Sequence, residues 1–259
     1  MTSLPALRTT LYFARVYART WRASIMTTFV NPTLYLLAMG VGLGSFVDRS
    51  TNRAALGGLT YLHFVAPALA ASAAATTAAS EAMFPVMGAI KWQRTYHAML
   101  ATPLRVGDVL AGHLIWMGVR ITTAVTSYLI VMVAFGAVSS PEGVAIVPVG
   151  LLTGAAFAAP LTAFAATQDH DGSFSLVFRL GLVPLFLFSA VFFPLSQLPA
   201  GLRAVAYLTP LWHGVALCRA LATGRAAAAE VGWHLAYLLS VSLLGVLAAR
   251  ITYRRRLLV

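Results

Sequence analysis

Long apolar stretches recur along this chain, and each is close to the length that an α-helix needs to cross a lipid bilayer. A hydrocarbon core about 30 Å thick is spanned by roughly 20 helical residues. Only 10% of the 259 residues are charged and 59% are hydrophobic, which is too little charge to coat a soluble domain of this size. Because backbone exposed to lipid must satisfy its own hydrogen bonds, such stretches predict helices. We therefore expect an all-α, polytopic membrane protein.

The apolar stretches predict six transmembrane helices, TM1 to TM6, within a single membrane domain that covers residues 1–259. The first apolar run begins near Ala23, after four arginines, and continues for about a full crossing, so no cleavable signal peptide is expected. No internal repeat and no appended soluble domain are expected either. The six predicted spans are residues 23–46, 59–80, 109–135, 144–167, 174–195 and 231–249.

The segment before the first span, residues 1–22, predicts an amphipathic helix. Leu7, Leu11 and Trp21 share one stripe of this helix, and its four arginines share another. Basic amphipathic helices of this kind lie in the inner headgroup layer of a membrane. We therefore expect an interfacial helix that does not cross the bilayer.

The longest polar interruption between two strongly apolar segments runs from Glu81 to Asp108 and holds the chain's only lysine. On a helix, its apolar side chains form one narrow stripe, and the polar ones lie around the other side. The stripe consists of Trp92, Tyr96 and Met99. Within residues 83–101 we therefore expect one short helix, Lys91–Leu100, that lies on a surface instead of crossing the membrane.

Residues 196–230 contain a stretch, Leu202–Leu221, that is apolar enough to resemble a seventh span. Three observations argue against a crossing. The pair Thr209-Pro210 breaks its centre, basic side chains interrupt it, and an additional crossing would place the arginines of residues 254–256 outside. We expect two short helices that fold back into the outer leaflet.

Basic residues are divided unevenly between the two sides of this six-span arrangement. Twelve of the 18 lysines and arginines fall on inner segments and five on outer segments, with Arg120 inside a span. The imbalance predicts that both termini are cytosolic. The inner set is Arg8, Arg15, Arg19, Arg22, Lys91, Arg94, Arg105, Arg179, Arg250, Arg254, Arg255 and Arg256, and the outer set is Arg49, Arg53, Arg203, Arg219 and Arg225.

No sequence pattern predicts catalysis or a bound metal. Asp169, His170 and Asp171 are neighbours on a turn, and adjacent loop positions rarely converge on one ion, so capping of the turn is the favoured interpretation. A phosphate-binding G-x-x-x-x-G-K-[ST] loop is impossible, because Ile90 precedes the only lysine. The single Cys218 excludes an intramolecular disulfide. We expect no catalytic residue, no metal and no cofactor bound by this chain.

Arg120 is the one ionisable residue placed deep in a predicted span, and it has two interpretations. It either handles substrate or protons, or it pairs with Glu81 across the second and third spans or reaches the inner headgroups. Pairing or reaching the headgroups is the favoured interpretation. The predicted spans contain no carboxylate, which argues against an ion-coupled carrier.

Aromatic side chains in two predicted spans are candidates for an apolar translocation path. Packing between helices or against lipid is an equally good interpretation of the same residues. The candidates are Phe29, Tyr35, Phe186, Phe188 and Phe192.

Several short motifs recur in one family of membrane proteins. They are residues 39–45 (MGVGLGS), 61–67 (YLHFVAP), 93–104 (QRTYHAMLATPL), 188–199 (FSAVFFPLSQLP), 208–214 (LTPLWHG) and 219–224 (RALATG). With these motifs the chain resembles the permeases of ABC-2 type transporters, in particular the permease branch of the nodulation lipo-oligosaccharide exporters, which is related to daunorubicin-type drug exporters. The similarity covers essentially the whole chain. One departure is Pro67-Ala68, where relatives often have Pro-Gly.

The resemblance implies a coupling helix between TM2 and TM3 and folded-back outer helices between TM5 and TM6. It also implies a dimer with a second permease copy or a paralogue, seated on two separate ATPase subunits that bind ATP and Mg. By position, the residues in contact with the ATPase are Lys91, Gln93, Arg94, Thr95 and Tyr96, with Asp169 and His170 as a second contact.

We therefore predict the permease subunit of an ABC exporter in the bacterial cytoplasmic membrane, without an ATPase site of its own. Its cargo is expected to be a lipid-linked saccharide, a glycolipid, or another amphiphile or hydrophobic drug. Two alternatives remain from the residues alone. One is a membrane-embedded, metal-dependent lipid transferase or phosphatase that uses Asp169 and Asp171, and the other is an ion-coupled drug carrier.

Overall fold

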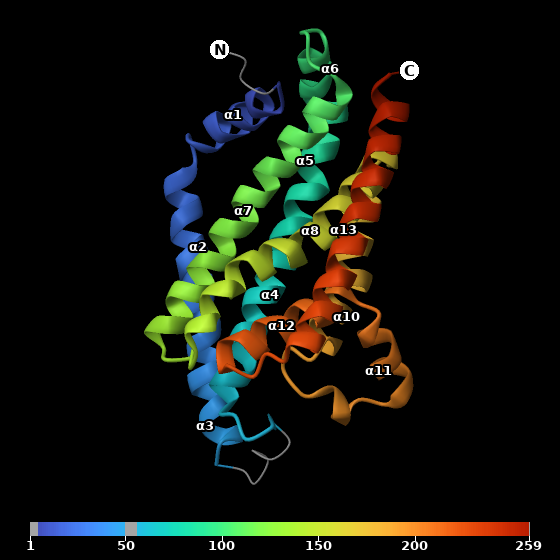
Figure 1. Cartoon of the computed structure of the whole chain (residues 1–259). Helices are drawn as coiled ribbons and strands as arrows, with labels where there is room; N and C mark the ends of the chain where they lie inside the picture. Colours follow the sequence, from blue (N-terminus) through green and yellow to red (C-terminus); the bar gives the residue numbers. More distant parts are fainter. Residues whose placement is uncertain (1–4, 50–55, 259) are drawn as a thin grey trace.

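The computed structural model describes residues 5–49 and 56–258, and over these residues the protein is a bundle of helices without a strand (Figure 1). The prediction of an all-α polytopic membrane protein is confirmed. Within the described residues, five helices are long and apolar enough to cross a membrane: Ser24–Val47, Tyr61–Trp92, Val106–Ala134, Pro141–Thr167 and Ala228–Leu257. Arg53, which the charge count places outside, and residues 1–4 of the predicted interfacial helix lie outside the described residues.

The two ends of the bundle are built from different elements (Figure 1). We call one the α6 end, where α1, α6 and the last turns of α13 lie, and the other the α11 end, where α3, α11 and α12 lie. The helices are α1 Pro5–Tyr17, α2 Trp21–Tyr35, η1 Leu36–Leu43, α3 Gly44–Val47, α4 Tyr61–Ala82, α5 Phe84–Met87, η3 Gly88–Trp92, α6 Thr95–Leu100, α7 Val106–Ala134, η4 Pro141–Ala145, α8 Ile146–Thr167, α9 Gly172–Leu176, η5 Val177–Leu182, α10 Val183–Phe188, η6 Leu195–Gln197, α11 Ala200–Tyr207, α12 Pro210–Thr223 and α13 Ala228–Leu257.

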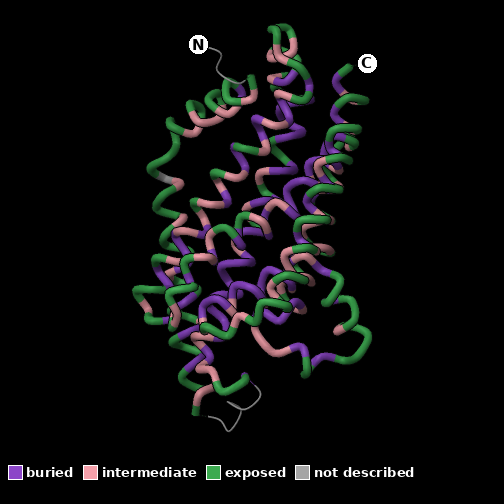
Figure 2. Tube along the Cα trace, in the orientation of Figure 1, coloured by how far each residue is buried: buried purple, intermediate pink, exposed green. Residues whose placement is uncertain are grey.

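The second span forms the centre of the bundle (Figure 2). Of its most apolar window, 72% is buried, compared with 22% for the first span. From Ala70 to Ala82, α4 is nearly all alanine, serine and threonine, and such small side chains let neighbouring helices approach closely.

The second span is also longer than predicted. It does not end at residue 80 but continues through α5 and η3 to Trp92. The chain bends at Met83, between α4 and α5, and Pro85 lies in the first turn of α5, where its missing N–H group has no intrahelical partner to lose. Glu81 therefore lies within this long helical segment and not in the polar interruption that follows it.

The predicted fifth span is shorter than expected. Its helix runs from Gly172 to Phe188, which is 17 residues or about 26 Å. Ala190 has a φ of 60°, a left-handed conformation that a right-handed helix cannot contain. The prediction of helix up to residue 195 is therefore wrong, and the chain turns after Phe188.

Between the fifth helical segment and α13 the chain forms short helices, and α11 and α12 lie on either side of Thr209. The Thr209 hydroxyl accepts a hydrogen bond from the Trp212 amide at 3.3 Å, which caps the start of α12. Gly224, with a φ of 66°, ends α12 in the left-handed conformation typical of helix C-termini. The following helix, α13, continues past the predicted end at residue 249 to Leu257.

Close packing between α8 and α13 depends on Gly245. A Cβ atom added there would lie 2.5 Å from Pro160 Cδ and 2.7 Å from Pro160 N. Gly245→Ala is expected to lower the unfolding free energy by about 1–3 kcal/mol through overpacking. Thermal unfolding of the purified protein in detergent measures this loss.

The matched control is Gly232→Ala on the same helix, where an added Cβ meets nothing within 4 Å. Alanine has the higher helix propensity, so this variant is expected to unfold at the same or a higher temperature. Equal melting temperatures for the two variants would contradict the close contact at Pro160.

Candidate functional site

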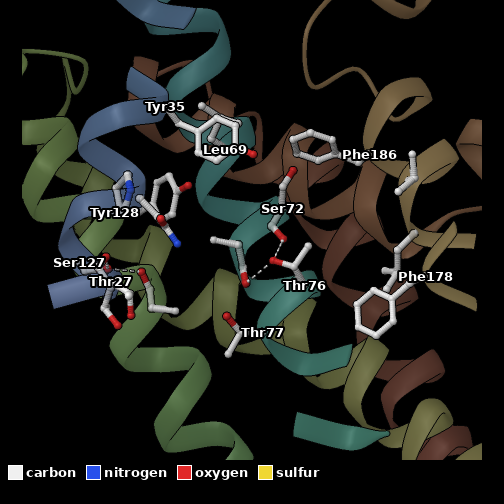
Figure 3. A pocket seen from close by; sticks show the side chains of 17 residues that line it. Thr27, Tyr35, Leu69, Ser72, Thr76, Thr77, Ser127, Tyr128, Phe178 and Phe186 are labelled. Carbon is white, nitrogen blue, oxygen red and sulfur yellow. Dashed lines mark hydrogen bonds between the residues drawn. The ribbon is translucent and has the colours of Figure 1, made fainter. Parts of the chain in front are cut away.

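A cavity of about 430 Å³ opens among α2, α4, α7 and the helical segment η5–α10. Figure 3 shows its arrangement: Thr27, Tyr35 and Ser127 lie on one side, Phe178 and Phe186 on the other, and the side chains of α4 between them. We call it the polar cavity. Its lining residues are Thr27, Thr28, Asn31, Pro32, Tyr35, Leu69, Ser72, Ala73, Thr76, Thr77, Ala124, Ser127, Tyr128, Phe178, Leu182, Val183 and Phe186.

The lining of the polar cavity combines hydroxyl groups with aromatic rings and contains no charged side chain. The Thr76 hydroxyl donates to the Ser72 carbonyl at 3.0 Å, and the Ser127 hydroxyl donates to the Thr28 carbonyl at 3.0 Å. Each hydroxyl oxygen keeps acceptor lone pairs after such a bond. The cavity therefore offers hydrogen bonds to an uncharged polar ligand.

The predicted path residues divide between lining and support. Tyr35 and Phe186 line the polar cavity. Phe192 does not line the cavity but packs against Phe186, with the two rings nearly perpendicular and their centroids 4.9 Å apart. Phe29 and Phe188 do not line it: Phe29 is exposed on α2, and Phe188 packs on a separate cluster around Leu195.

Sequence reasoning missed the hydroxyl groups of the polar cavity. Ser72, Thr76, Thr77 and Asn31 all line the cavity, and none of them was predicted to face a ligand. The signal was present in the alternation of alanine with serine and threonine on α4, which a helix that only packs does not need.

An ion pair lies one helical turn from the polar cavity, towards the α6 end. Arg120 Nε donates to Glu81 Oε1 at 2.9 Å, and the two side chains are only 19% and 20% exposed. The ring of Tyr17 on α1 lies 4.4 Å from the guanidinium carbon. The favoured interpretation of Arg120, pairing with Glu81 across the second and third spans, is confirmed.

A second candidate site is a groove of about 360 Å³ at the α6 end, lined by Ile90, Lys91, Arg94, His97 and Arg256. We call it the basic groove. Its walls come from η3, α6 and the last turns of α13, so it joins segments that lie far apart in the sequence. From the sequence, Arg256 was predicted only to lie on the inner side of the membrane, and its place in the groove was not predicted.

The basic groove exists because the predicted helix Lys91–Leu100 is broken. Arg94 has a φ of 50°, which ends η3 and starts α6 in a new direction. A non-glycine residue in this conformation stores backbone strain, which is common at functional sites. The prediction of one continuous helix is wrong at this residue.

Asp169 lies at the edge of the basic groove and contacts two of its side chains. Arg256 Nη2 donates to Asp169 Oδ1 at 2.6 Å, and Lys91 Nζ donates to the Asp169 carbonyl. The hydrogen bond and charge of Arg256 lower the pKa of the Asp169 carboxyl below its ordinary value. Because the carboxyl is 66% exposed, these contacts add little to stability and are easily exchanged.

The residues predicted to contact an ATPase differ in accessibility. Lys91, Gln93, Arg94, Asp169 and His170 are exposed and Thr95 is half-buried, whereas Tyr96 is completely buried. The Tyr96 hydroxyl bonds to His113 of α7 and lies near that of Tyr253 of α13, so its side chain offers no surface to a partner in this structure.

The described part of the chain holds no group of three or more metal-binding side chains. Asp169 bonds to Arg256, and Asp171 precedes α9, where its carbonyl accepts from the Phe174 amide at 3.0 Å. Nothing in this geometry favours the metal-dependent transferase over turn capping.

Comparison with known proteins identifies the type of protein that carries these two sites. A profile of the family described as "ABC-2 family transporter protein" matches residues 47–251. The chain belongs to the ABC-2 family of transporter proteins.

Relatives of this ABC-2 family chain include proteins named Nodulation protein J. The protein from Rhizobium leguminosarum bv. trifolii is 31% identical over 239 residues, which cover 91% of this chain and 87% of the relative. The protein from Sinorhizobium fredii is 32% identical over 200 residues, covering 76% of this chain and 73% of the relative. The protein from Bradyrhizobium diazoefficiens is 30% identical over 245 residues, covering 92% and 90%.

Family membership places this chain among multi-pass membrane proteins that act as transport components. It also implies an ABC ATPase as a partner. The prediction of an ABC-2 permease is confirmed.

Proposed function

We propose that this chain is the permease subunit of an ABC exporter that moves an amphiphile with an uncharged, hydroxyl-bearing head group, such as a glycolipid or lipid-linked saccharide. The observation that carries the proposal is the polar cavity in a chain of the ABC-2 family. Its volume of about 430 Å³ is within the usual range of ligand sites. Hydroxyl groups bind the head group, and aromatic rings contact its apolar faces.

The partners follow from the same proposal. Two copies of a separate ATPase subunit bind ATP and Mg, and the permease pairs with a second copy or a paralogue. The α6 end faces the cytosol of the bacterial cell, both termini lie there, and α11 and α12 fold back into the outer leaflet. The α6 end is the natural contact for the ATPase, because it carries the basic groove and the exposed Gln93 and His170.

The function is tested by reconstitution into proteoliposomes together with the ATPase, which we expect the neighbouring gene to encode. ATP-dependent movement of a glycolipid across the bilayer is the expected result. Transport that persists without the ATPase and collapses with the proton gradient would favour an ion-coupled carrier. Lipid turnover by the permease alone, abolished by Asp171→Asn, would favour the transferase.

The cargo site is tested by Thr76→Val, which removes one hydroxyl from the polar cavity and keeps its shape. Loss of one neutral hydrogen bond is expected to weaken glycolipid binding or transport by about 2-fold to 10-fold. Concentration-dependent transport in proteoliposomes measures the change.

The matched control is Thr123→Val on α7, an exposed threonine whose hydroxyl donates to the Val119 carbonyl at 2.8 Å. Thr123 does not line the polar cavity, so transport is expected to stay unchanged. Equal effects of the two variants would argue that Thr76 does not meet the cargo.

A further inference from the structure

Three polar side chains lie at seven-residue intervals along α7, at His113, Arg120 and Ser127. Seven residues make almost two helical turns, so the three share one face. Each of the three side chains contacts a different set of helices. We call these three residues the α7 row.

The α7 row begins at the α6 end with His113, which is 1% exposed. Its Nδ1 atom bonds to the hydroxyl of Tyr96 on α6, and that hydroxyl lies 3.3 Å from the Tyr253 hydroxyl on α13. Tyr96 and Tyr253 are both fully buried. The Tyr96 hydroxyl therefore joins three helices at a single atom.

The orientation of the His113 ring depends on few contacts. Its Nε2 atom is buried without a hydrogen-bond partner, so the bond to Tyr96 is the only one that we find for the ring. The ring also stacks on Phe13 of α1, with centroids 4.3 Å apart. Displacement of Tyr96 must therefore shift His113 or leave both ring nitrogens unpaired.

The other two members of the α7 row continue towards the polar cavity. Arg120 holds Glu81 on α4 and lies over Tyr17 of α1. Ser127 lines the cavity and donates to the Thr28 carbonyl on α2. One face of α7 thus joins the buried side of α6 to two walls of the cavity.

The basic groove is lined by close sequence neighbours of Tyr96 and Tyr253. Arg94 lies two residues before Tyr96, His97 follows it, and Arg256 lies three residues after Tyr253. Two of the three groove walls, α6 and α13, therefore meet at the buried Tyr96 hydroxyl.

We propose that Tyr96 is a positioning residue that transmits displacement of the basic groove through the α7 row to the polar cavity. This inference rests on the proposed function, since it needs an ATPase seated at the groove. Binding of the partner moves α6 about the break at Arg94, and the Tyr96 hydroxyl carries that movement to α7. Tyr96 touches neither cargo nor partner.

The test is Tyr96→Phe in the complete complex, because it keeps the ring and removes the hydroxyl. Assembly with the ATPase and basal ATP hydrolysis are expected to stay at wild-type levels. The number of cargo molecules moved per ATP hydrolysed is expected to fall by about 5-fold or more. A purely structural role would instead lower assembly, hydrolysis and transport together, and that result would overturn the proposal.

Tyr12→Phe on α1, where the ring is 40% exposed, is the matched control and is expected to leave the transport-to-hydrolysis ratio unchanged. Combining Tyr96→Phe with His113→Phe is expected to lower the ratio no further than the stronger single variant, because the two substitutions remove the same hydrogen bond. Independent, additive losses would overturn the proposal.

If Tyr96→Phe fails to accumulate in the membrane, His113→Phe replaces it as the test, because it removes the ring nitrogen that bonds to Tyr96 and lies outside the polar cavity. An unchanged transport-to-hydrolysis ratio in His113→Phe overturns the proposal. Failure of the proposed function looks different. In that case the wild-type complex itself shows no ATP-dependent transport or does not assemble with the ATPase.

Discussion

Replacement of Arg120 by methionine is expected to lower the unfolding free energy by about 3–5 kcal/mol, because it leaves Glu81 as an uncompensated charge among packed helices. Both side chains of the pair are only about one-fifth exposed, and no other basic group bonds to Glu81 among the interactions that we find for the described residues. Chemical unfolding of the purified protein in detergent measures the loss.

The control for this prediction removes both charges. The double variant Glu81→Leu with Arg120→Met replaces the pair by apolar side chains of similar length, and its stability is expected to return close to that of the wild type. A double variant as unstable as Arg120→Met alone would show that packing of the arginine stem, and not the ion pair, stabilises this site.

Arg94→Glu is expected to abolish ATP-driven transport in the complex, with a loss of at least about 10-fold. The substitution reverses the charge on one wall of the basic groove, where Lys91 and Arg256 supply the remaining positive charge. Like charges across a contact disfavour association, and the carboxylate competes with Asp169 for Arg256. Co-purification with the ATPase and transport in proteoliposomes measure the two consequences.

The matched control is Arg250→Glu, an exposed arginine of α13 that lies outside the basic groove. It applies the same charge change at the same end of the bundle and is expected to leave assembly and transport near wild-type levels. Normal assembly and normal transport in Arg94→Glu would rule out the groove as the contact.

The helical bundle could largely be predicted from the sequence, because the length and apolar composition of each span can be read from one continuous segment. The residues at which helices begin and end were predicted less well. Pro85 predicts the end of the span when only its residue type is considered, whereas the chain only bends at Met83, and Pro85, in the first turn of α5, lets the span resume and reach Trp92. Arg94 shows the opposite error, since no propensity predicts a left-handed arginine.

Sites were harder to predict than helices, because their residues come from distant segments. Tyr96 lies on an apolar stripe in the sequence, and that stripe suits a surface contact and a buried contact equally well. Only the approach of α7 and α13, through His113 and Tyr253, shows that it is buried. Likewise, the hydroxyls of α4 acquire meaning only when Ser127 and Phe186 face them across the polar cavity.

The length of the second span, and the bend within it, have a mechanical consequence. Its 32 residues extend over about 48 Å, which exceeds the hydrocarbon thickness of a bilayer by more than half. The span bears Thr76 at the polar cavity and Lys91 at the basic groove, and the chain bends between them at Met83, where α4 ends and before α5 begins. The 22 residues of α4 are about 33 Å long, so a tilt of α4 by about 5° about this bend moves its other end by roughly 3 Å, a displacement on the scale of a side chain.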